Sequence, residues 1–306
     1  MSKSSKNKEF FLPEFNMNML PIDGTIVLQG KRRSGKSVLA RDILYHLKDK
    51  IGGGIVVSGT EGISNPFYSD FVPPILISNA FDEKRMNTVI KNIGDMSKIR
   101  TKSGITEKRP QDRTFIILDD IMNLLTKPDK SEALRTIFFN GRHYGIFFMI
   151  TLQYLKGLSP NMRSNVDTVF LFKTNALKEL KEVYETYAAG IFETFDIFKK
   201  YNQTLPENHC MVLMSSRQGN DENAFIYKAD INIPPFKLCS QEYWEYSEKN
   251  MIDPLDESDE DSSDSDSGTG SGSKHSKDQI PGSIMKGKKG FRLVIDSDGN
   301  ATGIKT

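Results

Sequence analysis

The chain has 306 residues, of which 37% are hydrophobic and 26% are charged, and this composition is typical of one globular domain with attached tails. Cys210 and Cys239 lie far apart and form no C-x-x-C motif, which predicts a reducing compartment and disfavours a disulfide-stabilised secreted protein. The polar start of the chain lacks a signal sequence, and the longest apolar stretch, residues 145–152, is too short to span a bilayer. We therefore expect a soluble protein that is not secreted.

The net charge of +1 is unevenly distributed along the chain. Residues 251–273 contain eight acidic residues and no lysine or arginine, whereas the residues after them are basic. The body before residue 251 is mildly basic, which permits contact with a polyanion but does not require it.

The first predicted strand and helix enclose a phosphate-binding loop. A β-rich run at 25–29 precedes the loop, and apolar residues at helical spacing predict a helix over 36–50. Between them the chain matches G-x-x-x-x-G-K-[ST]: the glycines let N–H groups turn inward, Lys36 supplies an ammonium group for phosphate oxygens, and the Ser37 hydroxyl suits Mg²⁺. A glycine-rich turn with a chance lysine is the alternative, but it does not account for the flanking strand and helix. The residues predicted to bind ATP are Gly30, Lys31, Arg32, Arg33, Ser34, Gly35, Lys36, Ser37 and Val38.

The remaining elements predict a three-layer α/β fold of the P-loop NTPase type. Continuous hydrophobicity in the predicted strands indicates a mainly parallel sheet with helices on both faces. Two late runs flank a turn-like segment, 217–222, and predict an antiparallel pair at the sheet edge. In chain order, the other predicted elements are strands at 54–59 and 74–78, a helix at 83–99, a strand at 114–120, a helix at 131–140, strands at 146–153 and 167–173, a helix at 177–188, and the late strands at 209–215 and 223–231.

The strand predicted at 114–120 has the form of a Walker B strand. Its apolar residues end in two acids at the carboxyl end, where parallel sheets place their ligands. We expect Asp119 to bind Mg²⁺ and Asp120 to polarise the attacking water, because the chain begins to turn at the strand end and both side chains can then serve. The alternative is a solubilising acidic pair at a strand terminus.

Polar residues at both ends of the next strand extend the predicted site. Gln153 ends the strand at the same sheet edge as the loop, where it can hydrogen-bond the γ-phosphate and the attacking water. Arg142 precedes the strand and suits an arginine finger inserted into a neighbouring subunit's site. The alternatives are a helix C-terminal cation for Arg142 and a surface cap for Gln153. Arg163 is a rival finger or a DNA contact.

Composition divides the chain into four parts. A basic arm at 1–20 precedes the predicted ATPase domain at 21–250. Residues 251–284 form an acidic, Ser/Gly-rich segment that we expect to be a disordered linker, because it is too poor in apolar residues to pack. A basic peptide at 285–306 follows, with a small hairpin predicted around the sequence SDGN. These tails are either solvated or dock a partner.

Longer blocks of sequence resemble a known superfamily. The segment GRHYGIFFMITLQ, followed by NVDTVFLF, resembles the GR-x-x-GI…TQ block of the HerA–FtsK superfamily of DNA-pumping ATPases. The late strands resemble those that close that motor domain. The Asp-Asp pair and the segment SGTEGISNPFYSDFVPPILI are similar to the poxvirus-type virion DNA-packaging ATPases of large DNA viruses and virophages. The similarity covers roughly residues 21–233.

This resemblance implies a ring-forming ATPase that threads double-stranded DNA into a preformed capsid, with ATP and Mg²⁺ as cofactors. It assigns phosphate binding to Lys36, the catalytic carboxylate to Asp120, the sensor to Gln153 and the trans-acting finger to Arg142, with Mg²⁺ on Ser37 and Asp119. Asp120 departs from the usual glutamate, and its shorter side chain would slow hydrolysis or require a water bridge. The implied partners are DNA, further copies of the chain, and a capsid, portal or membrane protein. The implied place is the assembly site in the host cytoplasm or nucleus, or the virion.

The surface that would contact DNA is predicted in the basic segment before the Walker B strand. The alternative is a solvated flexible loop. Competing functions are a helicase or segregation-type translocase, and a nucleotide-gated assembly scaffold. The candidate DNA-contacting residues are Lys98, Arg100, Lys102, Lys108, Arg109 and Arg113.

Overall fold

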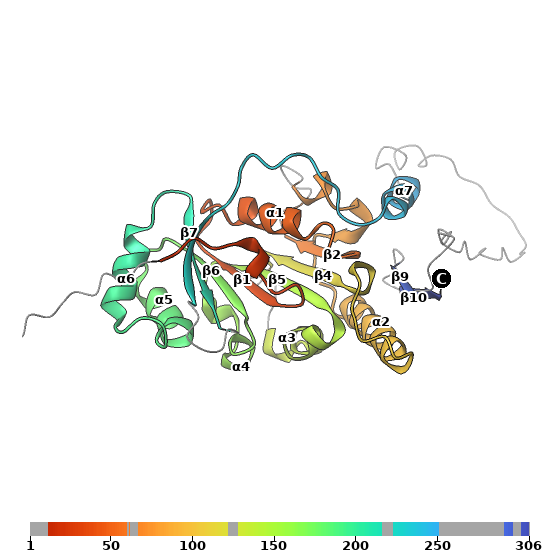
Figure 1. Ribbon diagram of the computed structural model, residues 1–306, viewed down its shortest axis with the longest axis horizontal. Helices are drawn as coiled ribbons and strands as arrows, with labels where there is room; N and C mark the ends of the chain where they lie inside the picture. Colours follow the sequence, from red (N-terminus) through yellow and green to blue (C-terminus); the bar gives the residue numbers. More distant parts are fainter. Residues whose placement is uncertain are drawn as a thin grey trace, which may run out of the picture.

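An eight-stranded sheet forms the centre of the computed structural model, which describes residues 12–59, 61, 67–121, 128–215, 223–250, 291–295 and 301–305. Its order is β3-β2-β4-β5-β1-β6-β7-β8, parallel from β3 to β6 and antiparallel from β6 to β8 (Figure 1). The predicted mainly parallel sheet with antiparallel edge strands is confirmed. The strands are β1 (Thr25–Gln29), β2 (Gly53–Ser58), β3 (Ile77–Ser78), β4 (Thr114–Asp119), β5 (Ile146–Leu152), β6 (Thr168–Phe172), β7 (His209–Met214) and β8 (Ala224–Lys228).

Helices cover both faces of this sheet. Successive side chains of a strand point to opposite faces, so the apolar strands supply residues to a core on each side. Ile116 and Ile150 join the apolar core beneath α2, α3, α5 and α6, whereas Ile117 and Met149 join the core on the side of α1. The sheet, with helices packed on each of its two faces, forms the three layers seen in Figure 1. The helices are α1 (Lys36–Leu47), α2 (Glu83–Lys102), α3 (Glu132–Tyr144), α4 (Pro160–Arg163), α5 (Leu177–Val183), α6 (Phe195–Thr204) and α7 (Gln241–Asn250), with short 3-10 turns η1 (Met17–Met19), η2 (Tyr68–Asp70), η3 (Pro74–Leu76), η4 (Pro110–Asp112), η6 (Pro128–Lys130) and η7 (Leu155–Gly157).

Some element boundaries differ from the sequence-based predictions. The run predicted as a strand at 74–78 pairs only in β3, because Pro73 and Pro74 have no N–H to donate to a neighbouring strand. The helix predicted at 83–99 continues to Lys102, shortly before Gly104 takes a φ of +73°. The helix predicted at 177–188 is α-helical only through α5 and continues as a π-helical turn, η8 (Tyr184–Ala188).

The two late strands pair as predicted. β7 and β8 are antiparallel, and the turn-like segment 217–222 between them lies outside the described residues. Near the end of the chain, β9 (Phe291–Ile295) and β10 (Ala301–Lys305) form a separate antiparallel pair, in agreement with the predicted hairpin. The acidic segment predicted as a linker, 251–284, lies outside the described residues.

Residues 12–20 pack against the edge of the sheet. Phe15 is buried, and its ring makes edge-to-face contacts with Phe170 and Tyr227. The backbone N–H of Phe15 donates to the carbonyl of Ile226, whose own N–H donates to Pro13, both at 2.9 Å. The packing therefore continues across the expected boundary at residue 20.

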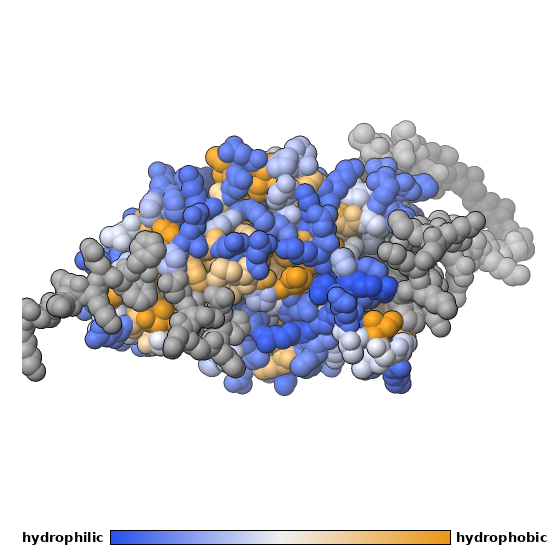
Figure 2. All heavy atoms as spheres, in the orientation of Figure 1, coloured by the Kyte–Doolittle hydropathy of each residue, from blue (hydrophilic) through white to orange (hydrophobic). Residues whose placement is uncertain are grey.

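The surface is mainly hydrophilic on the face shown in Figure 2, where hydrophobic residues form small, separate patches. Scattered apolar residues of this kind are ordinary on protein surfaces. Within the described part of the chain, no helix has the length and hydrophobicity that crossing a membrane requires.

Candidate active site

Three parallel strands bring the predicted site residues to one edge of the sheet. β5 lies between β1 and β4 and is parallel to both. The carboxyl ends of the three strands therefore meet at the same edge. The phosphate-binding loop follows β1, Asp119 ends β4, and Gln153 follows β5. The structure thus places the loop, the acidic pair and the glutamine side by side.

The conformation of the loop requires its two fixed glycines. A Cβ at Gly30 would lie 2.5 Å from Ser34 Oγ and 2.9 Å from Phe172 Cβ, which are distances that real Cβ atoms do not show. Gly35 has a φ of +99°, in the left-handed region that favours glycine. α1 begins at the next residue, so the N–H groups of its first turn and its positive end face the loop. This arrangement is a cradle for phosphate groups.

The ammonium group of Lys36 lies inside this loop. Its Nζ donates hydrogen bonds to the carbonyl oxygens of Gly30 at 2.8 Å and Lys31 at 2.9 Å. Burial lowers the pKa of Lys36, while the charges of Asp120 and Asp119 act in the opposite direction. Phosphate oxygens would be stronger partners than these neutral carbonyls, because hydrogen bonds between two charged groups are stronger.

Asp119 is a buried carboxylate suited to a cation. It is 7% exposed, and its Oδ1 accepts a 2.6 Å hydrogen bond from Thr151 Oγ1. Burial raises the pKa of Asp119, so the surrounding protein compensates its charge only in part. A divalent cation would complete that compensation, and the hard oxygen atoms of Asp119 and Ser37 are the ligand types that Mg²⁺ prefers.

Asp120 is directed into the same site by its backbone conformation. Its φ of +50° lies in the left-handed region, which breaks the strand alternation that would otherwise separate two adjacent side chains. Its N–H donates to Thr151 Oγ1 at 2.9 Å, and its Oδ1 accepts a 3.0 Å hydrogen bond from Gln153 Nε2. A carboxylate bonded to an amide in this way can orient a water molecule for attack on a phosphate.

A cavity of about 470 Å³ opens beside this carboxylate–amide pair. The end of β5, η7 and α5 surround it, and charged side chains of both signs line it. The cavity has room for a water molecule and for a side chain from a second protein molecule. Its lining residues include Asp120, Gln153, Lys156, Lys178, Glu179 and Glu182.

Tyr68 lies near the site in a segment, 67–69, to which the sequence-based prediction assigned no role in the chemistry. The Glu61 carboxylate accepts hydrogen bonds from the N–H groups of Phe67, Tyr68 and Ser69 at 3.0 to 3.1 Å. These bonds hold residues 67–69 beside Glu61, and Tyr68, fully buried, lies near Asp119; burial and the Asp119 charge raise the pKa of Tyr68. Its hydroxyl interacts with the Asp119 side chain, and this interaction lowers the pKa of Asp119 against the effect of burial. The bonds to the backbone commit Glu61 to structure rather than to catalysis.

Thr151 is a second site residue that the sequence-based prediction missed, although the sequence contains a signal for it. Thr151 precedes Gln153 by two residues, and residues at that spacing face the same side of a strand. A hydroxyl at this position could therefore have been predicted beside the glutamine. Its contact with both aspartates depends on the pairing order of β4 and β5, which no local pattern specifies.

The two candidate arginine fingers differ in location and accessibility. Arg142 lies in the last turn of α3, directly before the amino end of β5. The phosphate-binding loop lies at the carboxyl ends of the strands, so the two are at opposite ends of the parallel strands. Its guanidinium pairs with Asp167 yet remains 64% exposed. Arg163 is 15% exposed and pairs at 2.5 Å with Glu182, which lines the cavity. Both arginines are paired within their own chain, but only Arg142 has the accessibility that a trans-acting finger needs.

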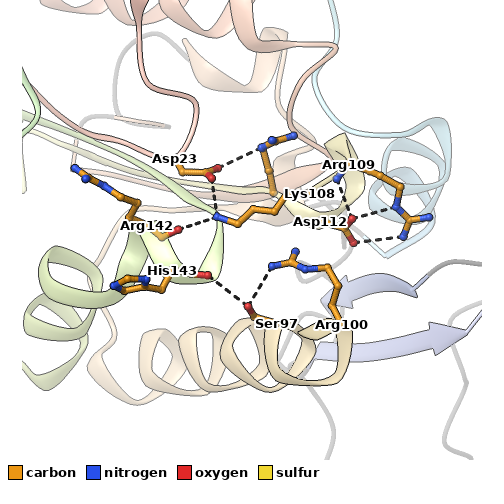
Figure 3. Close-up of polar contacts among 9 residues, drawn as sticks. Asp23, Ser97, Arg100, Lys108, Arg109, Asp112, Arg142 and His143 are labelled. Atoms are coloured by element: carbon orange, nitrogen blue, oxygen red, sulfur yellow. Dashed lines mark hydrogen bonds and ion pairs between the residues drawn. The ribbon is translucent and has the colours of Figure 1, made fainter. Parts of the chain in front are cut away.

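Most of the basic segment before β4 forms contacts within the molecule, as Figure 3 shows. Lys108 and Arg113 share the carboxylate of Asp23, at 2.6 and 3.2 Å. Lys98 and Lys102, in contrast, have exposed side chains near the end of α2, where Lys98 pairs at 2.9 Å with Asp95 on the same helix. Among the six basic residues expected to face DNA, these two lysines are therefore the most exposed. The other internal contacts join Arg109 to Asp112 and Arg100 to Ser97.

Comparisons with known proteins identify the family. Residues 13–186 match the family described as Poxvirus A32 protein. The uncharacterised protein L437 of Acanthamoeba polyphaga mimivirus is 31% identical, over 72% of this chain and 78% of its own. The uncharacterised protein 075L of Invertebrate iridescent virus 6 is 30% identical, over 80% of this chain and 96% of its own.

A solved structure shares the fold. The genome packaging NTPase B204 from Sulfolobus turreted icosahedral virus 2, in complex with AMPPCP, superposes with a TM-score of 0.50 at 19% identity. The match covers 69% of this chain and 100% of that one. With the phosphate-binding loop, the acidic pair and the glutamine in place, the chain is a P-loop ATPase, and it belongs to the Poxvirus A32 protein family.

Proposed function

We propose that this ATPase moves double-stranded DNA and packages a viral genome into a preformed capsid, acting as a homo-oligomeric ring. The observation that supports this proposal best is that the candidate catalytic residues lie at opposite ends of the parallel strands. Asp120 and Gln153 lie beside the phosphate-binding loop, whereas Arg142 lies at the far end. Membership of the Poxvirus A32 family and the fold shared with a genome packaging NTPase support the same function.

Within one subunit, separate residues would bind the phosphates, hold Mg²⁺ and activate the attacking water. Lys36 would exchange its two carbonyl partners for the β and γ oxygens of ATP. Ser37 and Asp119 would hold Mg²⁺, which neutralises phosphate charge when bound. Gln153 would orient the attacking water, and Asp120 would accept its proton.

A second subunit is needed to bring Arg142 to the nucleotide. β5 has seven residues, so its two ends are about 20 Å apart. Arg142 at one end therefore cannot reach a nucleotide bound at the other end of its own sheet. The exposed guanidinium of a neighbouring copy could enter the cavity beside Gln153 and neutralise charge in the transition state.

DNA would be held mainly through its phosphates, because a packaging motor must accept any sequence. Lys98 and Lys102 are the exposed candidates among the basic residues considered. In this proposal residues 21–250 form the motor, 251–284 a linker, and 1–20 and 285–306 basic terminal segments, the first of which packs on the motor through residues 12–20. Further partners would be a capsid, portal or membrane protein at the site of virus assembly.

ATP hydrolysis by the full chain, with and without linear double-stranded DNA, tests the proposal. We expect DNA to stimulate turnover, Lys36→Ala to abolish it, and Arg142→Ala to lower it by about 10³-fold with ATP binding retained. Turnover that ignores DNA, or that survives the loss of Arg142, would overturn the proposal. A strand-separation assay serves as a control, because unwinding would indicate a helicase instead.

A further inference from the structure

Arg142 is held at two points, one on its side chain and one on its backbone. Its guanidinium pairs with Asp167 Oδ1, and its carbonyl oxygen accepts a 2.8 Å hydrogen bond from Lys108 Nζ. The same Lys108 ammonium pairs with Asp23 Oδ2 at 2.6 Å. Figure 3 shows Lys108 between Asp23 and the backbone of Arg142, while the Arg142 side chain points away from it. Two separate contacts therefore constrain this residue.

Both contacts are anchored at the start of β1, the strand that leads to the phosphate-binding loop. Asp167 Oδ2 accepts a 2.8 Å hydrogen bond from the N–H of Thr25, and the Asp167 N–H donates to the Thr25 carbonyl at 2.9 Å. Asp23 lies two residues before Thr25 in the segment that enters β1. At its other end, β1 continues directly into Gly30 of the loop. The strand thus connects the nucleotide cradle to the anchors of Arg142.

Burial differs between the partners of the Arg142–Asp167 pair. The side chain of Asp167 is 6% exposed, and its second oxygen is already bonded to β1. The Arg142 side chain is 64% exposed, and a guanidinium has five donors, so a contact with one carboxylate oxygen leaves others directed outward. The carboxylate is therefore the fixed partner, and the arginine can engage a second anion without leaving it.

We propose that Asp167 and Lys108 form a mount that positions Arg142 as a finger and connects it to the nucleotide loop of the same subunit. The inference rests on the proposed function, in which Arg142 acts on a neighbour's nucleotide. The mount holds a long, flexible side chain in one direction, which lowers the entropic cost of inserting it. Asp167 and Lys108 are positioning residues and do not touch the substrate.

Mixed rings of two inactive variants test the mount. The Lys36→Ala donor cannot hydrolyse ATP but supplies a finger, and the Arg142→Ala acceptor has an intact loop but no finger. Mixed in equal amounts with DNA and ATP, they should recover turnover at the interfaces where a donor finger meets an acceptor loop. A donor that also contains Asp167→Asn should recover about tenfold less, because the amide still accepts from Thr25 but no longer pairs with Arg142.

A matched donor controls for charge removal in general. Lys36→Ala combined with Glu185→Gln removes one partner of an exposed ion pair elsewhere, and this donor should recover turnover fully. In an otherwise unchanged chain, Asp167→Asn should lower kcat and leave the affinity for ATP unchanged, a split that a purely structural role would not produce. If Asp167→Asn lowers the unfolding temperature, Lys108→Met provides the same test, since Arg113 still pairs with Asp23.

The outcomes separate the mount from the function on which it rests. Full recovery with the Asp167→Asn and Lys108→Met donors would overturn the mount and leave the trans finger intact. No recovery with the plain Lys36→Ala donor would show that Arg142 does not act in trans, and the mount would be rejected with it.

Discussion

Thr151 Oγ1 lies between the two aspartates at the end of β4, accepting from the Asp120 N–H at 2.9 Å and donating to Asp119 at 2.6 Å. Two adjacent carboxylates can face one site here because Asp120 has a φ of +50°. A left-handed conformation costs a non-glycine residue roughly 1–2 kcal/mol, and the bond to Thr151 offsets part of that cost. Strain at this position is therefore associated with the proposed chemistry.

Replacing the proposed catalytic carboxylate tests its role. We expect Asp120→Asn to bind ATP with unchanged affinity and to hydrolyse it at least about 100-fold more slowly, because the amide cannot accept the proton from water. Single-turnover hydrolysis and binding of a non-hydrolysable ATP analogue measure the two effects separately. Asp95→Asn, on the exposed surface of α2, is the matched control and should leave both unchanged. Normal hydrolysis by Asp120→Asn would remove Asp120 from the mechanism, whereas packaging retained by a variant that binds ATP without hydrolysing it would favour an assembly scaffold.

Tyr68→Phe tests the buried hydroxyl beside Asp119. The phenylalanine keeps the ring contacts with Phe67 and Phe71 and removes the hydroxyl that interacts with the Asp119 side chain. We therefore expect a modest loss of thermal stability, because a buried carboxylate loses one of its partners. We also expect the Mg²⁺ concentration that gives half-maximal turnover to rise several-fold, because Asp119 loses a neighbour that orients it. A lower unfolding temperature with an unchanged Mg²⁺ requirement would mean that the hydroxyl serves the fold alone.

At the scale of the elements, the pairing of β2 with β4 determines the position of the acidic pair at the end of β4. The two strands are in register from Gly53 with Thr114 to Ser58 with Asp119. Close packing accompanies this pairing, because a Cβ at Gly54 would lie 2.2 Å from the carbonyl oxygen of Phe115. A side chain at Gly54 would force the strand that positions Asp119 to move.

Gly54→Val tests this close packing. We expect it to lower the free energy of unfolding by about 2–3 kcal/mol or to prevent folding, because the added atoms meet backbone that cannot move aside. Urea denaturation measures the change. Gly190→Ala is the control, since a Cβ there meets nothing within 4 Å. Equal stability of the two variants would show that β2 can shift without cost.

Across the molecule as a whole, internal pairing reduces the basic surface that the sequence indicates. The segment before β4 is strongly basic when read along the chain, yet Lys108 and Arg113 neutralise Asp23, and Arg109 pairs with Asp112. The net positive charge of this surface is therefore smaller than the segment alone indicates. DNA binding, in the proposed function, depends on few exposed cations and on their repetition around a ring.

The salt dependence of DNA-stimulated hydrolysis tests this view. Stimulation should fall steeply as salt rises, while turnover without DNA changes little, because release of counterions from DNA supplies most of the affinity. Lys98→Ala and Lys102→Ala should each reduce the slope of log affinity against log salt by about 0.9 for each DNA phosphate that the variant no longer neutralises. Lys181→Ala, another exposed lysine, is the control and should leave the slope unchanged. Equal slopes in all variants would place the DNA-contacting surface elsewhere.

Short, contiguous patterns were enough to predict the nucleotide-binding half of the site. The loop at residues 30–38, the strand that ends in Asp119 and Asp120, and the position of Gln153 all follow from local residue types and from the alternation of strands and helices. Physically, phosphate binding needs a tight glycine turn before a helix, and a buried parallel strand needs continuous apolar residues. Both requirements are met within about ten residues of chain.

Contacts between distant parts of the chain, in contrast, became visible only in the folded molecule. Tyr68 lies near Asp119 because its backbone is bonded to the Glu61 carboxylate, and Thr151 meets both aspartates because β5 pairs with β4. Arg142 pairs with Asp167, 25 residues away in the sequence, and Lys108 pairs with Asp23, 85 residues away. Such contacts depend on strand order and on which carboxylates remain to be neutralised, and these are properties of the folded sheet that residue spacing along the chain does not contain.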